Sequence, residues 1–588
     1  MAAPKATGEM GGGETPTMGP GRTEPEEKGN RGDIMSSPAV TPDVELDMKD
    51  VELNEMETEK QPMNAAASSP LTGSPSEKNG AVMVKVSEEK DREAAAKFTG
   101  LSKEELLEVA STPAWVRTRW ALLILFWLGW LGMLAGAVAI IVQAPRCKDL
   151  PKQEWWQKGG LYRIQKVEAF QDSAADGVGD LAGLKQRMDY LSYLKVKGLV
   201  IGPLHVNPKD DQARTNLREV DSTLGTLAEF RDVLQAAKKK SLKVILDLTP
   251  NYRSESPWFG QPMDQNYDLQ EKMKEAIEFW LKEGVSGIQV GSVESLNDTQ
   301  ILDSWKNLTE QYADDHARVL IAVTRKQDAQ GIFSLLNETA GVDVLTSEYL
   351  AGLAKSDQDD AKKGETASQM IKNYIRAAGD KWAGWSLART SSGYLDAFRG
   401  EQLLRLYHML LYTLPGTPFT DYGDEIGLRD LPGQPAASSA IRMQWDNSAN
   451  FGFSKEAQQA GSQATSNVTV QAQRGNKDSV LTFFQQLSDL RGKERSLLHG
   501  DFSDFSEAGS SIPGVFSYLR VWDQNKRFLA VLNFGAQEST ITIAHPHLPP
   551  EVTLELSTDP SREKTQLSLQ GLKLGPLEGL LLSFTYVA

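Results

Sequence analysis

The residue with the clearest chemical potential is Cys147, the single cysteine among 588 residues. It lies five residues after a stretch without ionisable side chains, 120–142. Because the chain has no second cysteine, Cys147 can form a disulfide only with another molecule. In an oxidising compartment such an intermolecular disulfide is expected, and an unpaired thiol is the alternative. Cys147 is therefore predicted to link this chain to another membrane protein or to a second copy of itself.

Four asparagines have the Asn-x-Ser/Thr pattern that accepts N-linked glycan. They are Asn297, Asn307, Asn337 and Asn467. No such pattern occurs before residue 120. Basic residues flank both ends of 120–142, so charge alone does not decide the orientation of this segment. The position of the glycosylation patterns favours a cytosolic N-terminus and an extracellular C-terminal part.

An acidic loop formed by Asp172, Asp176 and Asp180 has the residue type that calcium prefers. The spacing excludes an EF-hand, since position 12 of that motif would be Gly183. Helix capping explains these aspartates more simply, and the six histidines show no ligand spacing. We therefore predict no metal site and no cofactor, and calcium binding at this loop stays open as the alternative.

The segment 120–142 predicts one transmembrane helix. As a helix its 23 residues span about 35 Å, which is enough to cross a hydrocarbon core of about 30 Å. More than a hundred residues precede it, so an uncleaved signal-anchor is expected in place of a signal peptide. Four small residues recur on one helix face and predict a packing surface for another membrane helix. They are Gly129, Gly132, Gly136 and Ala139.

The residues before this segment differ in composition from those after it. Residues 1–98 are rich in Gly, Pro, Ser, Glu and Lys, which predicts a disordered tail. A juxtamembrane helix follows at 99–119, with Ser102 and Glu105 spaced as a capping box. The chain as a whole has a net charge of −16, which argues against binding to nucleic acid.

After residue 155, short apolar strand patterns alternate with amphipathic helices. Eight such strands are predicted, at 160–165, 198–202, 243–248, 287–291, 318–324, 342–347, 383–388 and 417–421. Eight strands that are each followed by a helical segment favour a (β/α)8 TIM barrel. From about residue 500 the pattern changes to alternating strands at 515–522, 528–534 and 540–544, typical of a small antiparallel all-β domain.

The expected fold class is therefore α/β, in a single-pass type II membrane protein. Its expected parts are a cytosolic tail (1–98), a juxtamembrane helix (99–119), a signal-anchor (120–142), an extracellular neck with Cys147 (143–154), a (β/α)8 barrel (155–495) and a C-terminal β domain (496–588).

Four stretches of the globular part resemble motifs of the α-amylase and α-glucosidase family, at 170–181, 220–226, 247–251 and 413–427. The resemblance implies a barrel followed by a β-sandwich. In that family a retaining reaction uses a carboxylate nucleophile and a carboxylic acid/base about 5 Å apart. By this resemblance, Gly291 stands at the position of the family's nucleophile, and Gln289 stands at the position of its neighbouring arginine. The position of the acid/base corresponds to Val323 or Thr324. No catalytic residue is therefore predicted.

Other positions also depart from the family pattern. The substrate-binding histidine corresponds to Tyr252, and the family's Asn-His-Asp segment falls at 385–391, which contains neither His nor Asp. Asp247 remains, but it stands only 44 residues before Gly291. That interval leaves no room for the domain that the family inserts beside its substrate cleft. A barrel without nucleophile, acid or cleft wall favours a protein-interaction role.

The whole layout resembles the 4F2 heavy-chain family, the heavy subunits of heteromeric amino-acid transporters, including the stretch 48–54. The resemblance implies a non-catalytic subunit at the plasma membrane that stabilises a polytopic light chain, joined through Cys147, the membrane helix and the ectodomain. It also implies association with integrin β subunits. Two alternatives stay open here: an adhesion or signalling receptor with a glycosidase-like head, and an active α-glucosidase with displaced carboxylates.

Overall fold

The computed structural model describes 102–143, 148–253, 255, 258, 263–296, 299–337, 341–354, 360–387, 400–428, 441–455, 468–504, 513–546 and 548–585. The predictions for the tail 1–98, Cys147, Asn297, Asn467 and positions 388–391 lie outside these residues. The chain divides into two units, Met1–Ala121 and Leu122–Ala588, and each is described by itself.

Helix α1 (Lys103–Ser111) begins with the predicted capping box. The amide N of Ser102 donates to the Glu105 carboxylate at 3.0 Å, and the Glu105 amide N donates to Ser102 Oγ at 3.4 Å. Thr112 is extended and ends this helix. Helix α2 (Pro113–Gln143) starts at the next residue, seven positions before the predicted segment, because proline suits the first helical position.

Among the described residues, α2 is the one helix long and apolar enough to cross a membrane. None of its residues is buried against other parts of the chain. Its leucines, tryptophans and isoleucines are exposed, with Leu125 at 70% and Ile141 at 73%. A helix with so much uncovered apolar surface requires an apolar environment such as a bilayer. This finding fits the predicted single-pass anchor.

The predicted (β/α)8 barrel is confirmed. Eight parallel strands follow the order β8-β7-β6-β5-β2-β1-β10-β9, and a bridge between Leu345 and Ala383 joins the two end strands. The barrel strands are β1 (Leu161–Ile164), β2 (Gly198–Ile201), β5 (Lys243–Asp247), β6 (Gly287–Val290), β7 (Val319–Thr324), β8 (Val344–Ser347), β9 (Gly384–Ser386) and β10 (Thr417–Asp421). A short antiparallel pair, β3 (His205–Val206) and β4 (Asn216–Val220), follows β2.

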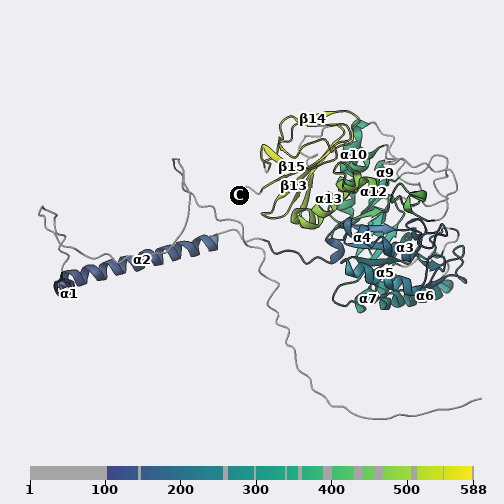
Figure 1. Ribbon diagram of the computed structural model, residues 1–588, viewed down its shortest axis with the longest axis horizontal. Helices are drawn as coiled ribbons and strands as arrows, with labels where there is room; N and C mark the ends of the chain where they lie inside the picture. Colours follow the sequence, from purple (N-terminus) through teal and green to yellow (C-terminus); the bar gives the residue numbers. More distant parts are fainter. Residues whose placement is uncertain are drawn as a thin grey trace, which may run out of the picture. The chain divides into compact units, whose positions relative to one another are not determined.

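Helices connect and cover these strands (Figure 1). They are α3 (Leu181–Gln186), α4 (Met188–Tyr193), α5 (Leu227–Lys239), α6 (Met263–Glu283), α7 (Ile301–Gln311), α8 (Ala329–Ser334), α9 (Ala351–Ala354), α10 (Asp360–Ala378), α11 (Glu401–Thr413), α12 (Val470–Gln473), α13 (Val480–Lys493) and α14 (Arg495–His499). Short 3₁₀ turns are η1 (Trp155–Gln157), η2 (Val167–Ala169), η3 (Val293–Ser295), η4 (Asp424–Ile426) and η5 (Ala449–Gly452).

Helix α6 illustrates how the sequence specifies these elements. Met273, Ile277 and Trp280 follow helical spacing, and each is fully buried. Gly284 follows the helix with φ of +100°, a conformation that glycine adopts without strain. The helix therefore ends at Glu283, directly before this glycine.

The barrel interior changes character along its length. Side chains alternate along each strand, so every second residue points inward. Near the amino-terminal ends the inward side chains form an apolar layer of Leu161, Val200, Ile245, Val319, Ile321, Val344 and Phe419. Near the carboxyl ends they are polar: Arg163, Asp247, Gln289, Ser386 and Asp421. The polar layer lies at the end of the barrel that carries catalytic sites in enzymes of this fold.

The C-terminal domain is an antiparallel two-layer structure, as predicted. Its main sheet has the order β11-β12-β13-β18-β15-β16, and β14 pairs with β17. The strands are β11 (Asp501–Asp504), β12 (Val515–Val521), β13 (Arg527–Asn533), β14 (Ser539–Ile541), β15 (Glu551–Ser557), β16 (Gln566–Ser568), β17 (Leu572–Leu574) and β18 (Gly579–Phe584). One face of the sheet packs on the β14–β17 pair, and the other shares the barrel's core cluster.

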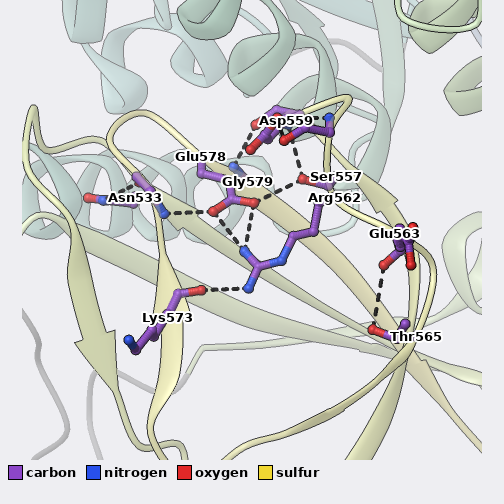
Figure 2. A network of polar contacts seen from close by, with 12 residues as sticks. Asn533, Ser557, Asp559, Arg562, Glu563, Thr565, Lys573, Glu578 and Gly579 are labelled. Carbon is purple, nitrogen blue, oxygen red and sulfur yellow. Dashed lines mark hydrogen bonds and ion pairs between the residues drawn. The ribbon is translucent and has the colours of Figure 1, made fainter.

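A network of hydrogen bonds and an ion pair centred on Arg562 and Glu578 links several segments of this domain (Figure 2). Arg562 contacts both oxygens of the buried Glu578 carboxylate, at 2.7 and 2.8 Å, and donates to the Lys573 carbonyl at 2.8 Å. The same carboxylate accepts from Ser557 Oγ and from the amide of Gly575. These bonds to Glu578 come from separate segments of the domain, so the network fixes the β14–β17 pair against the main sheet.

Two buried arginines join the barrel to the β domain. Arg520 of β12 donates to the carbonyls of Thr413, Leu497 and Gly500 at 2.6–3.1 Å. Arg491 of α13 donates to three carbonyls, those of Leu414, Gly416 and Leu497. Nearby, Asp504 of β11 accepts from Lys372 of α10, and in Figure 1 the β domain lies beside α10. The two domains therefore form one continuous packed unit.

Candidate functional site

The carboxyl ends of the barrel strands carry a compact set of hydrogen bonds around Asp247. One Asp247 oxygen accepts from the Thr249 hydroxyl at 2.6 Å and from the Thr249 amide at 2.8 Å. The other accepts from Gln289 Nε2 at 2.6 Å. The Gly291 amide donates to Thr249 Oγ1 at 2.7 Å. Thr249 thus occupies the space next to the position where the resemblance places a nucleophile.

Gly291 itself has little room for a side chain. A Cβ at this position would lie 2.8 Å from Thr249 Oγ1 and 3.1 Å from Thr249 Cγ2. Contacts under 3 Å require the neighbour to move, and Thr249 is held by Asp247. The local structure is therefore built around glycine at position 291.

The opposite side of the barrel mouth contains a buried ion pair. Arg163 Nε contacts Asp421 at 2.6 Å, and the side chains of both residues are less than a tenth exposed. The Arg163 guanidinium also donates to the Ser386 hydroxyl. The Asp421 carboxylate is thus neutralised by a partner on the adjacent strand. Thr324, the last residue of β7, is fully buried, and its Oγ1 accepts from the Lys326 amide.

The aspartates of the first loop bind backbone amides. Asp172 accepts from the amides of Ala175 and Gly177, at 2.7 and 2.8 Å. Asp180 caps α3 through the Gly183 amide at 2.6 Å and also accepts from Ser173. These bonds match the helix-capping interpretation. No group of three His, Cys, Asp or Glu side chains within the described ranges is arranged to hold a metal ion.

Sequence reasoning missed three parts of this arrangement. Thr249 follows β5, whereas Arg163 and Asp421 lie on β1 and β10, so only the barrel geometry brings these side chains to one end. Glu348, directly after β8, is 5% exposed and adds a further buried carboxylate near this end. Its position after a predicted strand was the one available signal.

Burial raises the pKa of the Asp247 carboxyl above its ordinary value of 3.8. A carboxyl with a raised folded-state pKa contributes stability below its unfolded pKa and loses it as the pH rises through the folded pKa. Asp247→Asn removes this charge. The Gln289 side chain, whose Oε1 has no hydrogen-bond partner, can rotate so that Oε1 accepts from the new amide.

We therefore expect Asp247→Asn and the wild type to have the same free energy of unfolding below about pH 3.8. As the pH rises, the variant should become more stable than the wild type, by about 1.4 kcal/mol for each unit by which folding raises the Asp247 pKa. Thermal unfolding of the purified full-length chain across pH 3.5–7.5 measures this difference. Asp232→Asn, at an exposed ion pair, is the control and should leave the pH profile unchanged. A destabilised Asp247→Asn variant at pH 7 would contradict the expectation.

The other predicted site residues lie on separate elements. Gly129, Gly132, Gly136 and Ala139 all belong to α2, and a Cβ built at any of the three glycines meets no atom within 4 Å. Asn307 lies exposed on α7, and Asn337 lies exposed beyond α8.

Comparison with known proteins matches two family models to this chain. The model "Solute carrier family 3 member 2 N-terminus" covers residues 83–162, and "Alpha amylase, catalytic domain" covers 167–267 and 387–500. Among solved structures, the trehalulose synthase MutB of Pseudomonas mesoacidophila is 18% identical over 74% of this chain and all of its own, with a TM-score of 0.58. Trehalose-6-phosphate hydrolase of Bacillus licheniformis is 15% identical over 73% of this chain and all of its own, with a TM-score of 0.59. These likenesses show the fold.

Relatives in sequence give the family. Amino acid transporter heavy chain SLC3A2 of Rattus norvegicus is 50% identical over 93% of this chain and all of its own length. Amino acid transporter heavy chain SLC3A1 of Homo sapiens is 28% identical over 84% of this chain and 87% of its own. Salivary alpha-glucosidase of Aedes aegypti is 24% identical over 65% of this chain and 86% of its own. The chain therefore belongs to the family of amino acid transporter heavy chains.

Proposed function

We propose that this chain is the disulfide-linked heavy subunit that stabilises a polytopic amino-acid transporter light chain and brings it to the plasma membrane. The observation that carries the proposal is the 50% identity to a transporter heavy chain over 93% of the sequence. One membrane helix cannot form an alternating-access pathway, which requires several helices around a central site. The solute therefore passes through the partner, and this chain supplies the anchor and the ectodomain.

In this proposal Cys147 forms the covalent link, and the α2 face of Gly129, Gly132, Gly136 and Ala139 packs on a partner helix. The N-terminus is cytosolic and the C-terminal part extracellular. The four glycosylation patterns on the C-terminal side support this orientation, and the two within the described residues, Asn307 and Asn337, are exposed. Association with integrin β subunits, through the membrane helix and the tail, is a further part of the proposal.

The barrel is proposed to be non-catalytic. Retaining hydrolysis needs one free carboxylate to attack and a second carboxyl to donate a proton. At the barrel mouth Asp247 accepts three internal hydrogen bonds and Asp421 is ion-paired with Arg163. Position 291 has no side chain, and Thr249 crowds the space that one would need. These contacts support a scaffold in place of a reaction centre.

Co-expression tests the proposal. Uptake of a neutral amino acid should rise severalfold when the full-length chain is expressed with a transporter light chain, compared with either chain alone, and surface labelling of the light chain should rise in parallel. Hydrolysis of a generic α-glucoside by the same cells is the control measurement and should equal the background. Unchanged uptake would favour an independent receptor. Hydrolysis that Asp247→Asn abolishes would favour an enzyme.

A further inference from the structure

The neck is attached to the β domain directly after Cys147. The Lys148 amide donates to the Asp523 carboxylate at 3.1 Å, and the Lys148 ammonium lies 5.9 Å from the centre of the Trp522 ring. Further along, Gln153 Nε2 donates to the Leu498 carbonyl at 3.3 Å. Trp155 then donates to the Ala317 carbonyl at 2.9 Å, at the amino-terminal end of the barrel. The neck is therefore held at successive points from residue 148 onward.

The turn that receives Lys148 is itself well supported. It joins β12 to β13, with Asp523 at φ +44° and the Asn525 amide bonded to the Trp522 carbonyl at 3.0 Å. The Trp522 amide donates to Ser496 Oγ at 3.2 Å, and its ring packs on His499 with centroids 5.4 Å apart. Both contacts come from α14, which Arg520 and Arg491 bind through the Leu497 carbonyl. The contacts of Trp522 with α14 thus fix the position of this turn.

We propose that Lys148, Trp522 and Asp523 form a neck latch, a set of contacts that directs Cys147 toward the light chain. The latch also places the β12–β13 turn beside the light-chain loop whose cysteine is bonded to Cys147. The inference rests on the proposed disulfide. Neighbouring Cα atoms are about 3.8 Å apart and disulfide-bonded Cα atoms at most about 6.8 Å, so the partner cysteine must lie within about 11 Å of Lys148. A loop at that distance reaches the turn to which Lys148 is bound.

The occupant of this surface is an extracellular loop of the light chain with apolar character beside its cysteine. Within the described residues, Leu150 is the single large hydrophobic side chain outside α1 and α2 that is exposed, at 50%. It follows Cys147 by three positions, on the part of the neck between the contacts of Lys148 and Gln153. An apolar contact at Leu150 and the disulfide at Cys147 therefore belong to one small interface.

The latch acts on the disulfide through chain entropy. Holding Lys148 restricts the positions that Cys147 can sample and raises its effective concentration at the partner thiol. In the proposed link, two thiols lose two protons and two electrons to a disulfide-bonded oxidase of the secretory pathway. Added dithiothreitol reverses this by thiol–disulfide exchange and is itself oxidised to a cyclic disulfide. Loss of the latch should shift this equilibrium toward the free thiols.

Asp523→Gly and Asp523→Asn form a matched pair for the test. Glycine adopts φ +44° without strain but has no acceptor for the Lys148 amide. Asparagine tolerates the same backbone and keeps an acceptor oxygen. Each variant of the full chain is co-expressed with a light chain. In membranes titrated with dithiothreitol, half-reduction of the adduct should need about three- to tenfold less reductant for Asp523→Gly, and within twofold of wild type for Asp523→Asn.

Hydrogen exchange of the neck peptide beginning at Lys148 supplies a readout that does not depend on the disulfide. It should be faster in Asp523→Gly and unchanged in Asp523→Asn. Wild-type exchange and reductant sensitivity in both variants would overturn the latch while leaving the proposed function intact. Absence of any adduct in the wild type would reject the proposed disulfide, and with it the latch's role in presenting Cys147. Faster exchange without a change in reductant sensitivity would likewise overturn that role.

Discussion

Cys147→Ser is expected to abolish the higher-mass adduct that the chain forms with a co-expressed light chain on non-reducing gels. The expectation is all-or-none because no other cysteine exists in the 588 residues. Adding reductant to the wild type should give the same pattern as the variant without reductant. Lys152→Ser, which introduces the same side chain at an exposed neck position outside the latch and leaves Cys147 in place, is the matched control and should retain the adduct. A band that persists in Cys147→Ser would exclude the covalent link.

Transport in Cys147→Ser should fall only partly, because in the proposed assembly the membrane helix and the ectodomain still contact the partner. The glycines of α2 allow this residual association to be tested. Nothing lies within 4 Å of a Cβ at Gly132 or Gly136, so Gly132→Leu and Gly136→Leu introduce no strain within this chain. Each should weaken association when combined with Cys147→Ser. Ala137→Leu enlarges a small residue away from that face and serves as the control.

Association is best measured by proximity labelling in intact membranes. Unchanged association in Gly132→Leu and Gly136→Leu would refute the proposed helix face. Complete loss of transport in Cys147→Ser alone would show that the noncovalent contacts are weak. The two measurements therefore separate the covalent part of the interface from the part inside the membrane.

The local patterns of the sequence predicted the architecture well. Strand β6 was expected at 287–291 and lies at Gly287–Val290, and β10 lies where it was expected. Such short buried strands are recognisable because apolar runs are bounded by glycine or proline. The Ser102–Glu105 capping box was also predictable, since both partners lie within one helical turn. These features share short sequence separation.

The polar layer at the barrel mouth was only partly predictable. Motif comparison located Asp247 and Gly291, but it could not show that Thr249 fills the space beside Gly291 or that Arg163 neutralises Asp421. Those contacts depend on which strands are neighbours and on the inward direction of each side chain. The two arginines between the domains gave no signal at all, because their partners are main-chain carbonyls, which no sequence pattern reports. Arg520 and Thr413 are 107 positions apart.

Arg520→Met is expected to destabilise the folded chain by about 3 kcal/mol or more. Arg520 is 1% exposed and its guanidinium binds carbonyls at the C-terminal ends of α11 and α14. Helix C-termini carry partial negative charge, which explains how main-chain carbonyls hold the two buried cations Arg491 and Arg520. Burial still lowers the pKa of Arg520 to about 10. Methionine fills part of the volume but leaves the Thr413 and Gly500 carbonyls without this donor.

Arg520→Lys separates charge from geometry. A lysine keeps the positive charge, but its compact ammonium cannot bond both helix ends as the planar guanidinium does, so an intermediate loss is expected. Arg218→Met, at an exposed ion pair with Glu275, removes the same side chain without burial and should change stability by less than about 0.5 kcal/mol. Thermal and urea unfolding of the purified full-length variants measures the stability of all three.

Because the β domain shares the barrel's core cluster, Arg520→Met should still unfold in a single transition at lower temperature. An unfolding midpoint of Arg520→Met equal to that of the wild type would show that the carbonyl contacts contribute nothing to stability. Two separate unfolding transitions would show that the contacts of Arg520 couple the two domains.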